Sequence, residues 1–180
     1  GAATVLWGPN QLSESQLEFA ANHFNLILLG SGKYGSFAAE ALQRFNPDVI
    51  TLSYLNSKQV QNGSKYHQQC EPVPNLFATD EIGNRIKTKR FDMWLMDIEN
   101  PEWSSILLDW ARSFSPYIDG IFLDDASPFL HSGYYSAFPA NYVPEDYSAD
   151  MKYLLADFKR GNGGSIVLRS EERRVGKECA

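Results

Sequence analysis

The sequence predicts an α/β protein built around a parallel β-sheet. Short apolar runs with the length of buried strands recur along the chain, and amphipathic helical patterns separate most of them. Several runs are apolar throughout, as in strands that are covered on both faces. This alternation is typical of a parallel sheet, which is either closed into a barrel or open with helices on both sides.

The first third of the chain contains three predicted strands and two predicted helices. The strands are residues 4–7, 26–29 and 49–55. Ser13 and Gln16 form a capping box that begins the first helix. The second helix covers residues 37–45 and ends at Asn46-Pro47. Residues 58–90 are polar and aperiodic, which is typical of a functional loop or a small insertion.

The central stretch, residues 91–125, predicts a strand, a helix and a second strand. The apolar runs 93–96 and 120–123 end at aspartates, Asp97 in the first case and Asp124-Asp125 in the second. Asn100-Pro101 is typical of an N-cap followed by a proline at the first helical position. We therefore expect a βαβ unit with acids at the carboxyl ends of both strands, the edge where such folds place their ligands.

The last part of the chain completes the expected barrel segment. A long loop, residues 126–147, precedes a helix over residues 151–158 and a sixth strand at residues 165–168. A complete (β/α)₈ barrel needs about 250 residues. Six strands therefore fit a (β/α)₈ TIM barrel that is truncated after about six strands, with residues 1–168 as its domain. Residues 169–179 resemble the translation of a sequencing adapter, so we interpret residues 169–180 as a non-native tail.

Composition excludes several classes of function. The net charge is −6 and basic residues form no patch, which argues against nucleic acid as the main partner. No apolar run reaches the roughly 20 residues that span a bilayer, so we expect no membrane partner. With the tail set aside, Cys70 is the single cysteine and no intrachain disulfide is expected. The oligomeric state is left open.

The strand-end acids suggest catalysis. Asp97, Asp124 and Asp125 follow predicted neighbouring strands, so their carboxylates are expected to converge on one cleft. Glycoside hydrolysis uses such a pair, one carboxyl group as the proton donor and the other as nucleophile or base. Because successive strand residues point to opposite sides, we expect only one of Asp124 and Asp125 to face the reaction centre. The other is expected to cap the next turn.

Aromatic and polar residues near the same edge are candidates for binding a sugar. Sugar rings offer apolar faces to aromatic rings and hydroxyl groups to amides and imidazoles. The expected substrate-binding residues are Trp7, Tyr34, Tyr54, Asn56, His131 and Tyr134. Each aromatic ring has an alternative role in packing its loop onto the core. No spacing of histidine and cysteine predicts a metal site.

A glycine-rich turn supports a competing hypothesis. Gly30 to Gly35 reads GSGKYG, follows a strand and begins a helix, as in a dinucleotide-binding fingerprint. The fingerprint also expects an acid near the end of the next strand, where this chain has Asn56 instead. The alternative is an open-sheet α/β protein that binds a dinucleotide through residues 30–35.

Three segments resemble those of glycoside hydrolases with a TIM-barrel fold, a hypothetical glycosyl hydrolase group related to polygalactosaminidase-like and α-amylase-like barrels. The segments are YLNS at 54–57, WLMD with NPEW at 94–103, and DGIFLDD at 119–125. The resemblance implies an enzyme, a glycosidase that acts on a carbohydrate substrate without a cofactor, and favours a secreted location.

By position, the resemblance assigns Asp97 to the fourth strand and Asp124 or Asp125 to the fifth. Our hypothesis makes Asp97 the nucleophile or base and Asp125 or Asp124 the acid. A second alternative is a non-catalytic barrel that binds carbohydrate.

Overall fold

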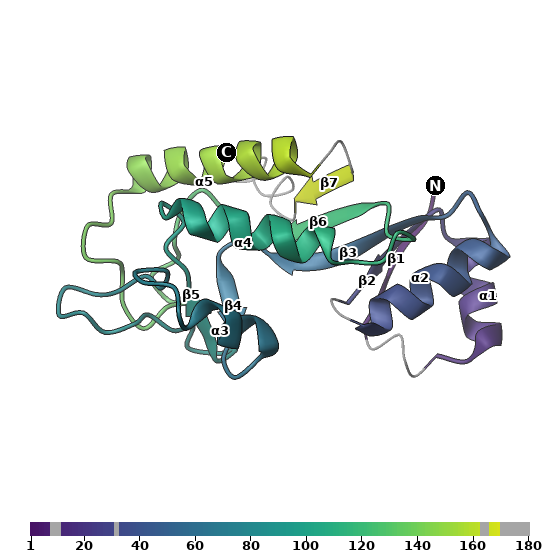
Figure 1. The fold of residues 1–180 in the computed structure, drawn as a ribbon, viewed down its shortest axis with the longest axis horizontal. Coiled ribbons are helices and arrows are strands. Elements are labelled where there is room, and N and C mark those ends of the chain that lie inside the picture. Colours follow the sequence, from purple (N-terminus) through teal and green to yellow (C-terminus); the bar gives the residue numbers. More distant parts are fainter. Residues whose placement is uncertain (8–11, 31–32, 163–165, 170–180) are drawn as a thin grey trace, which may run out of the picture.

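The chain folds around a five-stranded parallel sheet. The computed structural model describes residues 1–7, 12–30, 33–162 and 166–169, with the backbone alone at 33–36 and 166–169. The order across the sheet is β1-β2-β3-β6-β7, and every pairing is parallel (Figure 1). The strands are β1 (Ala3–Leu6), β2 (Leu26–Leu29), β3 (Ile50–Asn56), β6 (Gly120–Asp124) and β7 (Ile166–Arg169).

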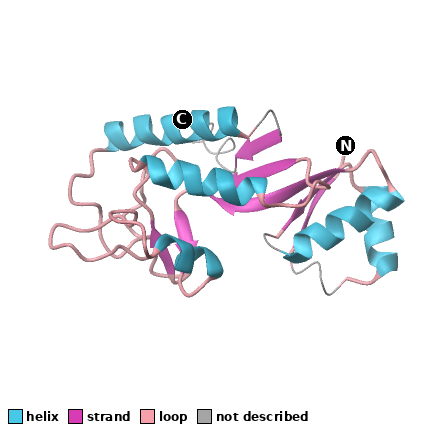
Figure 2. Ribbon diagram, in the orientation of Figure 1, coloured by secondary structure: helices cyan, strands magenta, loops and turns pink. Residues whose placement is uncertain are grey.

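Four long helices pack on one face of this sheet (Figure 2). Ile27 and Leu29 of β2 pack in one core with α1 (Glu14–His23) and α2 (Lys33–Phe45). Leu55, Ile121 and Leu123 pack in a second core with α4 (Pro101–Arg112) and α5 (Pro144–Gly161). The register places these five strand residues on the same side of the sheet.

The opposite side of the sheet, which we call the inner face, presents the alternate residues. These are Val5, Leu28, Leu52, Tyr54, Asn56, Phe122 and Asp124. Strand order that follows the chain order, with the long helices on one face, is the arrangement of a barrel wall. An open doubly wound sheet instead reverses its strand order and carries helices on both faces. The open-sheet alternative is therefore wrong for the described sheet.

The strand predicted at residues 93–96 forms, but in another sheet. β5 (Met93–Leu95) pairs antiparallel with β4 (Gln59–Gln61), and this two-stranded sheet lies beside α3 (Lys65–Cys70) (Figure 1). In the main sheet β6 pairs directly with β3. The expected βαβ unit with two adjacent parallel strands was wrong, because β5 belongs to an insertion between β3 and α4. We call this insertion, residues 57–100, the small lobe.

The helix-start signals are confirmed. Ser13 and Gln16 form both hydrogen bonds of the capping box at α1. Asn100 caps α4, where its Oδ1 accepts a hydrogen bond of 3.0 Å from the Glu102 amide, and Pro101 is the first helical residue. Such signals succeed because they act within one turn of the chain. Of the helices described, none has the length and apolar character to cross a membrane.

Candidate active site

A row of aromatic rings crosses the inner face near the carboxyl ends of the strands. The Trp7 ring meets the Tyr54 ring edge-on, with centroids 5.3 Å apart. The Tyr54 ring in turn stacks on Phe122, its register partner on β6, at 6.4 Å. Trp7 remains 65% exposed at the end of the row. Rings from β3, from β6 and from the residue after β1 thus form one apolar surface.

Two aspartates lie next to this row, and β3 holds both of them. Asp124 ends β6, and its Oδ2 accepts a hydrogen bond of 2.9 Å from Tyr54 Oη. Asp125 follows, and its Oδ2 accepts a hydrogen bond of 2.8 Å from Asn56 Nδ2. Asn56 Nδ2 also lies 3.5 Å from Tyr54 Oη, so one network joins both carboxylates to the end of β3.

Both carboxylates lie on the same side because Asp125 leaves the strand. Its φ is +54°, in the left-handed region that aspartate tolerates better than most residues. The expectation that Asp124 and Asp125 point to opposite sides assumed a regular strand through both residues. The turn at Asp125 ends that alternation, and the two acids become neighbours in one site.

Tyr135 and Tyr147 lie near Asp125, and each contacts a further buried polar residue outside the predicted binding set. Gln59 Nε2 donates a hydrogen bond of 2.7 Å to Tyr135 Oη, and both side chains are buried. Lys58 is also buried, and its Nζ lies 5.9 Å from the centre of the Tyr147 ring. Gln59 Oε1 and Tyr147 Oη are buried without a hydrogen-bond partner among the described residues. One signal was available: Tyr147 extends the apolar stripe of α5 by one turn before Met151.

The charges of the two aspartates act on the surrounding phenols. Burial, followed by the charge of Asp124, raises the pKa of Tyr54. Burial and then the charge of Asp125 raise the pKa values of Tyr134 and Tyr135. Burial raises the pKa of Tyr147 well above its ordinary value, and Asp125 contributes to that shift. These phenols therefore stay protonated and can act as hydrogen-bond donors.

Asp97 lies in a different setting from the one the sequence predicted. It follows β5 in the small lobe, so the assignment of Asp97 to a strand of the main sheet was wrong. Its Oδ1 accepts a hydrogen bond of 3.1 Å from the Glu99 amide. Asp97 lines a pocket of about 590 Å³ together with Glu99, Asp146 and Tyr147. Tyr147 thus lies between this pocket and the surroundings of Asp125.

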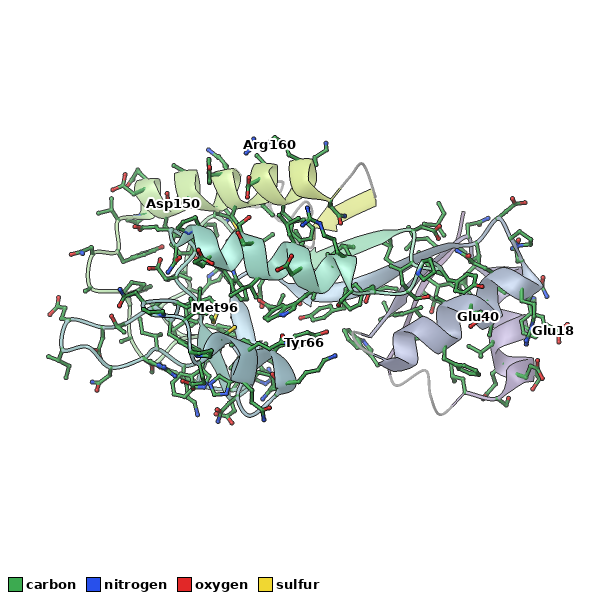
Figure 3. All side chains as sticks on the ribbon, viewed as in Figure 1. Glu18, Glu40, Tyr66, Met96, Asp150 and Arg160 are labelled. Atoms are coloured by element: carbon green, nitrogen blue, oxygen red, sulfur yellow. The ribbon has the colours of Figure 1, made fainter. Side chains whose placement is uncertain are left out.

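Two acids of this pocket, Asp97 and Glu99, resist ionisation. Burial raises the pKa of Asp97, and the charge of Asp150 adds to the shift. Burial also raises the pKa of Glu99, followed by the charges of Asp150, Asp97 and Asp146. Figure 3 shows Asp150 on α5, above the small lobe in which Met96 is labelled. A carboxyl group with a raised pKa is suited to donate a proton.

The remaining predicted binding residues are scattered. His131 is exposed, and its ring packs edge-on against Phe129 with centroids 4.8 Å apart. Tyr134 packs edge-on against Tyr135 at 5.0 Å, which places it near Asp125. Tyr34 belongs to the first turn of α2, and its side chain lies outside the described residues, as do Ser31 and Gly32 of the glycine-rich turn. The tail after residue 169 also lies outside them.

The structure offers no obvious site for a metal ion within the described ranges. No group of three or more histidine, cysteine, aspartate or glutamate side chains there has an arrangement that would hold one.

Comparison with known proteins identifies the fold. No protein-family model matches the chain, and no curated protein matches it in sequence. Solved structures do match it. The glycoside hydrolase domain of PelA from Pseudomonas aeruginosa has a TM-score of 0.68 at 15% identity, over 94% of this chain and 59% of that one.

The chain has part of the (β/α)₈-barrel fold of glycoside hydrolases. The α-galactosidase TtGalA from Thermus thermophilus matches with a TM-score of 0.64 at 14% identity, over 93% of this chain and 37% of that one. The maltogenic α-amylase AmyB from Thermotoga neapolitana gives 0.56 at 14% identity, over 93% and 45%. The chain spans about three-fifths or less of the length of these structures.

Proposed function

We propose that the chain belongs to a glycosidase that cleaves a glycosidic bond in a poly- or oligosaccharide. The observation that carries the proposal is the pair Asp124 and Asp125, held by Tyr54 and Asn56 at the carboxyl end of β6. In a (β/α)₈ barrel this edge carries the catalytic groups. The fold shared with glycoside hydrolases supports the same reaction class, although fold alone does not determine activity.

The hydrogen bonds suggest a division of roles. Hydrogen bonds from neighbouring side chains fix the orientation of a carboxylate. Asp124 accepts one from the Tyr54 hydroxyl and Asp125 accepts one from the Asn56 amide, so both suit the nucleophile or base. Asp97, whose pKa is raised by burial, suits the proton donor on the far side of Tyr147. This assignment exchanges the roles that the sequence suggested for Asp97 and Asp125.

The aromatic row supports a carbohydrate as the substrate. Trp7 and Tyr54 present ring surface beside the acids, and Trp7 is exposed. The hydrolase needs no cofactor in this scheme, since two carboxyl groups and water suffice. A non-catalytic barrel that binds carbohydrate is the second candidate, because a sugar ring could stack on the exposed Trp7 ring without any bond being cleaved.

The test is hydrolysis of a polysaccharide panel by the 180-residue chain and by Asp124→Asn, Asp125→Asn and Asp97→Asn. Loss of a general acid or base is expected to lower kcat by about 10²–10⁴-fold. Asp109→Asn is the control, since Asp109 lies exposed on α4 in an ion pair with Arg112. Sugar binding without cleavage by the unmodified chain identifies the non-catalytic alternative. Full activity in all three site variants contradicts the proposal.

A further inference from the structure

Asn56 was expected to bind a sugar hydroxyl, but both ends of its side-chain amide are used within the protein. Its Oδ1 accepts hydrogen bonds from the backbone amides of Lys58, at 3.1 Å, and Gln59, at 2.8 Å. Its Nδ2 donates to Asp125 Oδ2 at 2.8 Å. The side chain is 8% exposed. With these bonds in place, the Asn56 amide has little capacity left for a ligand.

The two ends of Asn56 act on two different parts of the site. The Oδ1 end holds the turn that leads from β3 into β4, and this turn places Lys58 and Gln59 inside the protein. The Nδ2 end fixes one oxygen of Asp125, the residue in the left-handed conformation. A single amide therefore ties the start of the small lobe to the acid after β6.

We infer that Asn56 is a positioning residue: it orients the Asp125 carboxylate for catalysis and does not bind the sugar itself. The inference rests on the proposed glycosidase function. It assigns to Asn56 the task of holding one oxygen of Asp125 and thereby fixing the direction of the whole carboxylate. Without the amide donor, the carboxylate loses a charge-assisted hydrogen bond in a crowded, partly buried setting.

Other groups around Asp125 also respond to pH. Asp124 precedes it on β6, and Tyr54 approaches from β3. Tyr134 and Tyr135 face it from the loop after β6, and Tyr147 faces it from α5. Lys58 lies against the ring of Tyr147. The four phenols remain protonated near neutral pH, so their charge does not change when Asp125 titrates.

Asn56→Asp is the sharpest test. The new carboxyl group keeps an acceptor for the Lys58 and Gln59 amides but replaces the donor to Asp125 with a second acid. Like charges raise each other's pKa, so the acid limb of the kcat/KM profile is expected to move to higher pH by about 1 pH unit or more. At neutral pH, kcat is expected to fall about ten- to hundredfold with KM nearly unchanged. Asn56→Ser, which is shorter, keeps the test available if Asn56→Asp fails to fold.

The control is Asn62→Ala. Asn62 also donates from Nδ2 to an aspartate, Asp92, at 3.0 Å, but that pair lies in the small lobe at the surface. Its loss is expected to leave kcat and the pH profile unchanged. A rise in KM with an unchanged kcat and pH profile in Asn56→Asp and Asn56→Ser would mean that Asn56 binds the sugar, and this result overturns the inference.

A second measurement separates this inference from the proposed function. Titration of the Asp125 side-chain carbonyl by ¹³C NMR needs no substrate. An Asp125 pKa that rises in Asn56→Asp and Asn56→Ser, in a chain that cleaves no glycoside, contradicts the glycosidase and retains the action of Asn56 on Asp125. An Asp125 pKa that is unchanged in both folded variants rejects the inference even if the chain is an active glycosidase.

Discussion

At the scale of single residues, local surroundings decide what each aspartate can do. Asp124 and Asp125 accept hydrogen bonds from a phenol and an amide, respectively. Asp97 is held by a backbone amide in an acidic pocket, where burial opposes its charge. The three residues are chemically identical and look equivalent in the sequence. Their difference arises from partners that are contributed by other elements.

The raised pKa of Asp97 predicts a pH-dependent cost to stability. A carboxyl group with a higher pKa when folded binds more protons in the folded state, so its contribution to stability is lost as pH rises through the folded pKa. Asp97→Asn is therefore expected to increase the free energy of unfolding at pH 7 relative to the unmodified chain. At a pH below the ordinary value for aspartate the difference should disappear. Urea denaturation at both pH values measures it.

The pKa of Asp92 is shifted in the opposite direction to that of Asp97. A hydrogen bond from Lys87, followed by one from Asn62, lowers the pKa of Asp92. Asp92→Asn is expected to reduce stability near neutral pH, with the effect lost as pH falls through the lowered pKa. Equal behaviour of the two variants would show that burial does not govern Asp97.

At the scale of elements, the insertion after β3 has the largest effect on the site. The small lobe carries Asp97 away from the main sheet. It also brings Lys58 against Tyr147 of α5 and Gln59 against Tyr135 of the loop after β6. α4 holds this lobe to the sheet, because the fully buried Trp103 donates from Nε1 to the Ser57 carbonyl at 2.7 Å. The first turn of α4 therefore helps to fix the position of the residues that follow β3.

Removal of the N-cap of α4 tests this link. Asn100→Ala eliminates the acceptor for the Glu102 amide and is expected to reduce the free energy of unfolding by about 1 kcal/mol, within a range of about 0.5–2 kcal/mol. Ser105→Ala on the exposed side of the same helix is the control and should change stability by less than about 0.5 kcal/mol. Chemical denaturation followed by tryptophan fluorescence gives both values. Equal stabilities for the two variants would show that the Asn100 cap does not stabilise α4.

In the molecule as a whole, helices cover one face of the parallel sheet, and the strand at one end of the sheet has an exposed edge. β1 stands at one end of the strand order, and Val5 on its inner face is 46% exposed. Among the described residues, β1 pairs only with β2, so its other edge carries unpaired backbone groups. Such an edge can pair with a strand of another molecule. Trp7 adds exposed apolar surface to the same end.

We expect copies of the chain to associate through the β1 edge. The isolated 180-residue chain is expected to self-associate as its concentration increases, and Val5→Lys is expected to reduce the association because a charge on an edge strand disfavours pairing. Light scattering over a concentration series measures the mass. Tyr153→Lys is a control, since Tyr153 is 65% exposed on α5, away from the edge. Identical association of all three chains would place the contact elsewhere.

Much of the fold could be predicted from the sequence, because its signals are local. Strand lengths, helix caps and the position of acids after strands depend on residues a few places apart, and the capping residues Ser13 and Asn100 act as expected. The sheet partners could not be predicted this way. An apolar run such as residues 93–96 has the same pattern in either sheet, and only its pairing with β4 excludes it from the barrel wall.

The alternation of strands and helices, and the presence of acids at residues 124 and 125, follow from local sequence patterns alone. Tertiary structure decided which acids share a site, because that depends on residues 69 positions apart, such as Asn56 and Asp125, meeting across adjacent strands. It also turned Asp125 into the left-handed conformation, which no periodicity reveals. Local patterns depend on residues that are close in the sequence, whereas the site forms because the sheet brings together residues that are far apart in the sequence.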